Sequence, residues 1–298
     1  MTWVEGAVLG LVQGLTEFLP VSSSGHLVLA QTLLGVNPPG LTLEITVHLA
    51  TMAAVAAAFW RDLARIVAAA FRALAPRGRV APSPGEPAGR PGGRRAAPPR
   101  GWSDPSLRLL VWLAAGTVPA ALAGLAFEDW FAALFSSPRA VGWALMVTGL
   151  LLVLPGRKGR EGRGLDRLGV RDALVVGVLQ AAALAPGLSR SGATIAGGLL
   201  SGLDRDASVR FSFLLSVPAV LGAGLLDLTG WLSGGASGAT ALAGVSDPRL
   251  LLSAAGAAAL SGYAAIRLVV ASVRAGRLGW FALYCWALGA AALGLGRF

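Results

Sequence analysis

Residues Gln13 to His26 read QGLTEFLPVSSSGH and place polar side chains inside a strongly apolar part of the chain. Gln13 and Glu17 are four residues apart and therefore share one face of a helix. Pro20 predicts the end of that helix, and the serine-rich residues 22–26 predict a loop before the next apolar run. Ionisable groups and broken helices at membrane depth occur where they serve a function or line a cavity. We therefore expect this stretch to form the functional site.

The composition predicts a polytopic membrane protein. Of 298 residues, 55% are hydrophobic and only 13% are charged, and the mean hydropathy is +0.67, whereas about 25% of residues in a soluble domain are charged. The net charge of +10 comes from basic residues that cluster between apolar runs without interleaved aromatics. We therefore expect no nucleic-acid partner. The single cysteine excludes an intramolecular disulfide.

The apolar runs predict an all-α fold made of two halves, each with one broken, re-entrant helix pair and three transmembrane helices. The first half, residues 1–155, holds the re-entrant segment 4–35 and spans at about 43–60, 107–126 and 140–155. The second half, residues 156–298, holds the re-entrant segment 173–203 and spans at about 209–230, 249–271 and 279–296. A polar stretch follows the first span, and its Pro-, Gly- and Arg-rich part, residues 76–105, predicts a disordered cytoplasmic loop.

The two halves match each other without gaps, which predicts an internal repeat. The matched positions pair Gly10 with Gly177, Gln13 with Gln180, Ser22 with Ser189, Ser24 with Ser191, Gly25 with Gly192 and Gly35 with Gly202. Because each half contains an odd number of crossings, the second half is predicted to be inverted relative to the first. Inverted repeats with broken helices are typical of transporters, whose binding sites lie near the midplane.

The distribution of basic residues favours this inverted arrangement. If loop 61–108 is cytoplasmic, all but four of the 25 lysines and arginines fall on the cytoplasmic side or its adjoining turns. The first re-entrant segment then enters from outside and the second from the cytoplasm. We expect their two loops to meet between the halves.

The second broken segment carries an anion-binding pattern. Residues Pro186 to Thr194 read PGLSRSGAT and precede a helix of small residues. Hydroxyl groups and the free N–H groups of a helix N-terminus donate to phosphate oxygens, and Arg190 adds a bidentate positive fork. Residues 22–26 repeat the arrangement. The phosphate-binding candidates are Ser22, Ser24, Ser189, Ser191, Gly192 and Thr194.

Together, the two motifs resemble the bacterial undecaprenyl-diphosphate phosphatase family, the bacitracin-resistance membrane proteins. The resemblance covers nearly the whole chain except the insert 76–105. It implies an enzyme of the bacterial plasma membrane that hydrolyses a polyprenyl diphosphate lipid and so recycles the carrier for peptidoglycan synthesis. It also implies a divalent cation, Mg²⁺ or Ca²⁺, contacts with membrane lipids, and a site open to the external side. A homodimer is left open.

The resemblance also assigns roles by position. It implies that Glu17, Ser23, His26 and Arg190 are catalytic: Ser23 as nucleophile or phosphate ligand, His26 as general acid or base, and Arg190 as phosphate clamp. Glu17 would also hold the metal, with Gln13 as a second ligand. Gln13 stands where other members carry glutamate, which puts a two-carboxylate metal site in doubt. Attack by Ser23 and attack by water both remain open.

Two further positions carry alternatives. Glu44 and His48 lie four residues apart and either form a supporting pair beside the site or simply pair with each other. Ser22 and Ser24 equally fit a role in satisfying backbone groups of the loop.

Two other functions compete with the phosphatase. Lipid phosphatases of the phosphatidic-acid type need a second histidine after the Ser-Arg motif, but both histidines of this chain precede it. A transporter or flippase of a polyprenyl phosphate or phospholipid would use the same midplane site. It would not need a histidine and a serine beside a phosphate clamp, so the enzyme is favoured.

Overall fold

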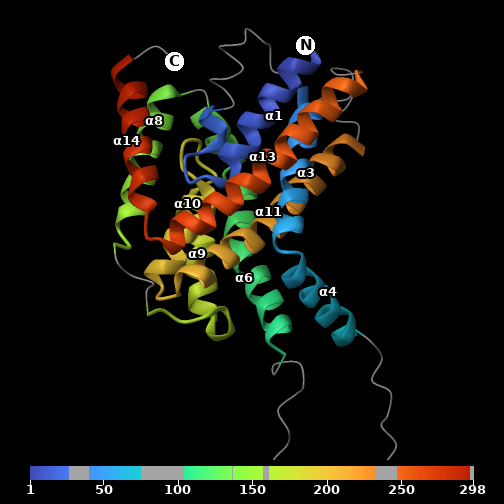
Figure 1. Ribbon diagram of the computed structural model, residues 1–298, viewed down its shortest axis with the longest axis vertical. Coiled ribbons are helices and arrows are strands. Elements are labelled where there is room, and N and C mark those ends of the chain that lie inside the picture. The colour runs from blue at the N-terminus through green and yellow to red at the C-terminus, as the bar shows by residue number, and fades with distance from the viewer. Residues whose placement is uncertain (27–39, 75–103, 136, 157–160, 233–246, 296–298) are drawn as a thin grey trace, which may run out of the picture.

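The computed structural model describes residues 1–26, 40–74, 104–135, 137–156, 161–232 and 247–295, which form a bundle of helices (Figure 1). Within these residues, β-structure is limited to one isolated bridge between Arg163 and Leu203. The all-α class is therefore confirmed. The start of α1 and the end of α14 lie at the same end of the bundle, away from α4.

The described residues form eleven α-helices and one 3₁₀ turn. In order they are α1 (Trp3–Phe18), α3 (Gly40–Ala58), α4 (Trp60–Leu74), α6 (Pro105–Ala126), α7 (Glu128–Phe135), α8 (Pro138–Val153), the 3₁₀ turn η1 (Leu165–Arg167), α9 (Val170–Ala182), α10 (Arg190–Leu200), α11 (Arg205–Leu232), α13 (Pro248–Arg274) and α14 (Leu278–Leu295). Helices α9 and α10 fall on the second predicted broken segment. Helices α6, α8, α11, α13 and α14 fall on predicted spans.

Local sequence signals explain where several helices begin. Asp104, Ser137 and Asp247 each accept a hydrogen bond from a backbone N–H and are each followed by proline at the first helical position. Thr2 and Glu5 form a reciprocal capping box at the start of α1. These caps satisfy N–H groups that have no partner within the helix.

From the sequence, residues 61–108 are predicted to be one loop. This is wrong for residues 61–74, which are helical. They belong to α4, which is bent by 88° from α3. Its arginines and its apolar residues fall on separate sides of one helix, a pattern typical of a surface helix. Residues 27–35 of the first broken segment and nearly all of the predicted loop 76–105 lie outside the described residues.

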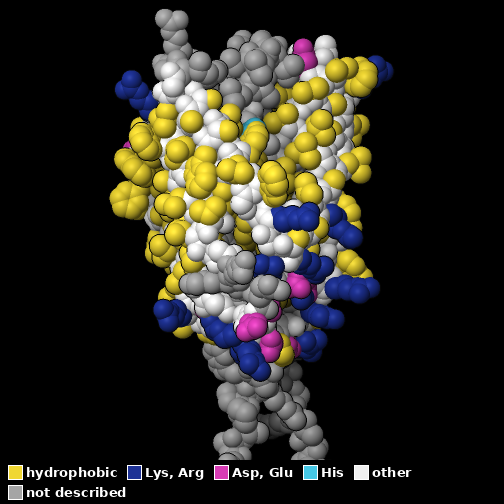
Figure 2. All heavy atoms as spheres, turned by 60° about the vertical axis from the view of Figure 1, so that its left-hand side comes forward, with side chains coloured by type: hydrophobic (Ala, Val, Ile, Leu, Met, Phe, Trp, Pro, Cys, Tyr) yellow, Lys and Arg dark blue, Asp and Glu magenta, His cyan; other side chains and the backbone are white. Residues whose placement is uncertain are grey.

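Fewer spans are evident in the described residues than the six that the sequence predicts. Helices α6 and α13 are long and apolar enough to cross a membrane, and the count rises to four if the bent pairs α3–α4 and α7–α8 are single spans. The described part of α14 is apolar but shorter than a full crossing. Figure 2 shows a broad band of hydrophobic side chains, with Lys and Arg gathered mainly toward one end.

Glycines bring the backbones of paired helices into close contact. Helix α1 packs on α13, and a Cβ atom at Gly10 would lie 2.1 Å from the carbonyl oxygen of Ala254. Helix α9 packs on α6, and a Cβ at Gly177 would lie 2.4 Å from the carbonyl oxygen of Gly116. Small residues permit such close approach, which favours van der Waals packing in a membrane. The packing of α1 on α13 and of α9 on α6 fixes the two helices that lead into the helix breaks.

Candidate active site between the two broken helices

The breaks after α1 and before α10 meet in the interior of the protein. Arg190, the first residue of α10, forms an ion pair with Glu17 near the end of α1. Ser191 Oγ donates to the carbonyl oxygen of Leu19 over 3.2 Å. The two motifs, far apart in sequence, thus form one site.

The first loop is held in an unusual backbone conformation. Ser22 has φ = 71°, in the left-handed region that residues with side chains seldom adopt. Its carbonyl oxygen accepts a hydrogen bond from His26 Nδ1 over 2.7 Å. Two residues earlier in the same loop, the carbonyl oxygen of Pro20 contacts Cys285 Sγ of α14 at 3.4 Å. Such backbone strain persists where the surroundings enforce it and is common at functional sites.

Helix α8 fixes the second loop. Thr148 Oγ1 accepts the backbone N–H of Ser189 over 3.0 Å and lies 3.1 Å from the carbonyl oxygen of Gly187. Gly187 has φ = 91°, and a Cβ there would lie 2.5 Å from the carbonyl oxygen of Val141, so the turn requires glycine. Ser189 caps α10 by accepting the N–H of Gly192 over 3.2 Å. The N-terminus of α10 is therefore rigidly placed beside Glu17.

Glu17 is the centre of the polar network. Its carboxylate oxygen Oε1 pairs with Arg190, while Oε2 accepts hydrogen bonds from Ser23 Oγ at 2.9 Å and from Gln13 Nε2 at 3.0 Å. The Glu17 side chain is only 8% exposed. A buried carboxylate needs both a counter-charge and hydrogen bonds, and here it has both. Ser23 bonds to Glu17, and no hydrogen bond joins it to His26 within the described residues.

Gln13 links Glu17 to His48. His48 Nδ1 lies 2.8 Å from the backbone carbonyl oxygen of Glu44, which can only accept, so Nδ1 carries the proton. His48 Nε2 then accepts from the Gln13 amide, 3.4 Å away. His48 therefore supports the site through Gln13, while Glu44 contributes its backbone carbonyl to that chain of contacts.

His26 has a partner that the sequence does not predict. Its Nδ1 donates to the Ser22 carbonyl, so Nε2 accepts the hydroxyl of Tyr284 over 2.6 Å. The two rings also stack, with centroids 5.6 Å apart and planes 15° apart. The only sequence signal was that Tyr284 is one of two tyrosines, placed in an otherwise apolar span.

The remaining phosphate-binding candidates lie in pairs or behind the loops. Ser22 Oγ is 3.3 Å from Ser24 Oγ, and Ser189 Oγ is 3.2 Å from Ser191 Oγ. Thr194 is buried, and its hydroxyl lies within hydrogen-bonding distance of the Arg190 carbonyl oxygen and, at 2.6 Å, of Ser212 Oγ. Thr194 thus stabilises the first turn of α10 from behind.

The donor set for a metal ion is sparse. Within the described part of the chain, no three His, Cys, Asp or Glu side chains are grouped as a metal site would require. Glu17 and Gln13 offer oxygen atoms of the kind that Mg²⁺ and Ca²⁺ prefer. One carboxylate and one amide fit only a cation that takes its other ligands from water or from a bound phosphate.

We expect Tyr284→Phe to lower kcat by up to about tenfold, because it removes one neutral hydrogen bond that holds His26, worth roughly 1 kcal/mol. Phosphate release from a diphosphate lipid would measure the effect. The matched control is Tyr263→Phe, which changes the only other tyrosine and leaves His26 untouched. Equal rates for Tyr284→Phe and Tyr263→Phe would contradict a role of the hydroxyl.

The fold and the site together define an α-helical integral membrane protein with a Glu17–Arg190 ion pair where two helix breaks meet. Residues 6–291 match the family described as bacitracin resistance protein BacA, and the chain belongs to this family. It is 40% identical to the undecaprenyl-diphosphatase of Halothermothrix orenii over 94% of this chain and 93% of that protein. The undecaprenyl-diphosphatase of Desulfatibacillum aliphaticivorans is 39% identical over 98% of each chain.

Proposed function

We propose that the protein is a membrane phosphatase that hydrolyses undecaprenyl diphosphate to undecaprenyl phosphate and inorganic phosphate. One observation carries this proposal: Ser23 donates its hydroxyl proton toward Glu17, whose other oxygen pairs with Arg190. The proposed nucleophile Ser23, the proposed base Glu17 and the guanidinium of Arg190, which would bind phosphate, are therefore adjacent. The names of relatives that match nearly the whole chain support the same substrate.

Arg190 and the start of α10 bind the terminal phosphate. The phosphate displaces Glu17 from the guanidinium, which then forms paired hydrogen bonds to phosphate oxygens. Donors fixed in advance stabilise the charge that develops on the transferring group. The bond from Ser189 N–H to Thr148 keeps the loop from moving as the ligand binds.

Freed from Arg190, Glu17 accepts the proton of Ser23 as Ser23 Oγ attacks the terminal phosphorus. The bond from phosphorus to the bridging oxygen breaks, and the lipid monophosphate leaves with its electron pair. His26 holds its own proton on Nδ1, bound to the Ser22 carbonyl, so Nε2 first takes up a proton from water by way of the Tyr284 hydroxyl and then passes it to the leaving phosphate. Water then hydrolyses the phosphoserine and restores Ser23. Direct attack by water, with Glu17 as base, is the alternative route.

A divalent cation, Mg²⁺ or Ca²⁺, belongs to the proposal. Glu17 and Gln13 would hold it once the Gln13 amide presents its oxygen instead of its nitrogen. When bound, the cation would neutralise part of the phosphate charge. Because only one carboxylate is available, substrate oxygens and water would complete its ligands.

Topology and cellular role complete the proposal. The protein is an inverted repeat in the bacterial plasma membrane, with its site open to the external side. In support, the broken helix of each half packs on a helix of the other half, α1 on α13 and α9 on α6. Hydrolysis there recycles the lipid carrier for peptidoglycan synthesis and confers bacitracin resistance.

The packing of each half's broken helix on a helix of the other half also favours a second candidate, a transporter of the same lipid phosphate. Transport needs a phosphate clamp but no hydroxyl bonded to a carboxylate beside it. The bond between Ser23 and Glu17 therefore favours hydrolysis over transport.

The decisive experiment measures phosphate release from undecaprenyl diphosphate by purified protein in detergent, with and without EDTA. We expect release that stops with the chelator and resumes when Mg²⁺ or Ca²⁺ is added back. Folded protein that binds the lipid but releases no phosphate under any of these conditions would contradict the phosphatase and favour the transporter.

A further inference from the structure

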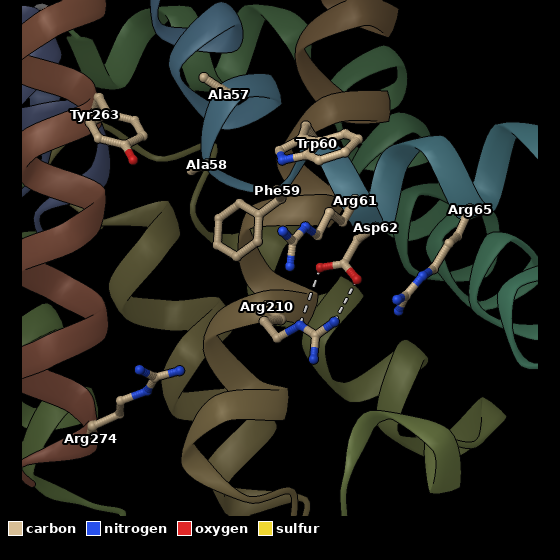
Figure 3. A pocket seen from close by; sticks show the side chains of 10 residues that line it. All are labelled: Ala57, Ala58, Phe59, Trp60, Arg61, Asp62, Arg65, Arg210, Tyr263 and Arg274. Atoms are coloured by element: carbon tan, nitrogen blue, oxygen red, sulfur yellow. Dashed lines mark hydrogen bonds and ion pairs between the residues drawn. The ribbon is translucent and has the colours of Figure 1, made fainter.

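A second polar cavity lies at the bend between α3 and α4, and none of its lining residues belongs to the candidate active site. Its volume is about 520 Å³. Four arginines line it, from α4, α11 and α13, together with three aromatic side chains (Figure 3). The arginines are Arg61, Arg65, Arg210 and Arg274.

The charges of this arginine pocket are only partly balanced. Asp62 is its one acidic lining residue among those described, and it is bound by Arg210 through contacts of 2.5 and 3.2 Å. Arg274 pairs with Asp206 over 2.5 Å. For Arg61 and Arg65, no carboxylate partner lies within the described chain. Arg61 instead lies over the Trp60 ring, 5.6 Å from its centroid. The pocket therefore keeps an excess of positive charge.

Helix α4 shows how the pocket meets its surroundings. Its exposed apolar residues recur at helical spacing along one face: Trp60, Val67, Phe71 and Leu74. Arg61, Arg65 and Arg72 follow one adjoining flank. A helix with an apolar face beside a row of arginines lies in the membrane interface. Since α4 is nearly perpendicular to α3, it lies along the membrane surface when α3 crosses the membrane.

An ion pair joins the far end of α4 to the start of α6. Arg72 contacts Asp104, the N-cap of α6, over 2.9 Å. Hydrogen bonds from the Arg72 side chain and from the Ser106 N–H lower the pKa of Asp104, so the carboxylate stays charged at neutral pH. The bend at Trp60 joins one end of α4 to α3 and the Arg72 pair joins the other end to α6, so a membrane that α3 crosses would have the pocket near its surface.

We propose that the arginine pocket binds the phosphate head group of an anionic phospholipid. Arginine forks match the geometry of phosphate oxygens, and basic pockets between helices at a membrane surface bind such head groups. The aromatic lining and the exposed apolar face of α4 favour a lipid over a free anion, because both offer contacts to the glycerol and acyl chains. The site is independent of the proposed catalysis.

The test compares thermal unfolding of the purified full-length protein in detergent with added phosphatidylglycerol, phosphatidylcholine or inorganic phosphate. The test variant is Arg61→Gln/Arg65→Gln. The control variant, Arg139→Gln/Arg249→Gln, removes the same charge from exposed positions outside the pocket. We expect phosphatidylglycerol to raise the unfolding midpoint of wild type and control more than phosphatidylcholine does. In the test variant this extra shift should fall by more than half.

Three outcomes would overturn the proposal. An equal loss of the shift in both variants would mean that only overall charge matters. A shift with inorganic phosphate as large as with phosphatidylglycerol would identify a free-anion site. An unchanged shift in the test variant would exclude the pocket. Arg65→Gln alone, at an exposed position, serves as a second variant should the double substitution fail to fold.

Discussion

Arg190→Ala is expected to lower phosphate release by about 10²–10³-fold, the usual effect of removing one fixed donor to a transition-state charge. Arg190→Lys should recover only part of the loss, because an ammonium group cannot form the paired hydrogen bonds of a guanidinium. The measurement is the rate of phosphate release at equal amounts of folded protein. Arg249→Ala, at the exposed start of α13, removes the same charge outside the site. This control should keep the wild-type rate.

The same substitution also leaves Glu17 as a buried charge without its counter-ion, which costs about 3–5 kcal/mol. A double variant separates folding from catalysis. Glu17→Gln/Arg190→Met removes both charges and should recover much of the thermal stability that Arg190→Ala loses. It should nevertheless release no phosphate. Wild-type rates in Arg190→Ala, or activity in the double variant, would contradict the proposed site.

Gly10→Ala is expected to destabilise the protein by about 1–3 kcal/mol, the range for forcing an extra group into a filled interface. The added Cβ would lie 2.1 Å from the Ala254 carbonyl oxygen, so α1 and α13 must separate. Because α1 carries Glu17, activity should fall as well. The measurement is the midpoint of thermal unfolding in detergent.

The control for this substitution lies on the partner helix. A Cβ at Gly256, within α13, would meet nothing within 4 Å. Gly256→Ala should therefore leave stability unchanged or raise it slightly, since alanine favours helix over glycine. Equal stability of Gly10→Ala and Gly256→Ala would show that the close helix contact is not required.

The sequence predicts that the two broken segments meet, but it does not predict that Glu17 pairs with Arg190, which the structure shows. In physical terms the pair is reasonable, because both residues lie beside a helix break in an apolar chain and a charged group at membrane depth needs a partner away from lipid. The contact of His48 with Gln13 was not predictable, because it depends on how α3 packs beside α1. Tyr284 was missed because α14 reads as a uniformly apolar helix, and only its packing brings the hydroxyl to His26.

Matching sequence positions did not predict matching contacts. Gln180 aligns with Gln13, yet both of its amide atoms are buried without a hydrogen-bond partner among the described residues. Gln13 contacts Glu17 and His48, and no such pair stands at the corresponding place in the second half. Helix α4 was missed for a different reason: its arginines suggested a loop, although their spacing keeps them on one flank.

The packing of α1 on α13 sets the order in which the protein can assemble. During synthesis, the first helix is made long before the helix that fills its glycine face. Glu17 therefore has no Arg190 partner, and α1 has no α13 to pack on, until the second half of the chain has been made. A chain that stops before α13 holds both Glu17 and Arg190 but lacks the helix on which α1 packs, so we expect the candidate site to be completed late in synthesis.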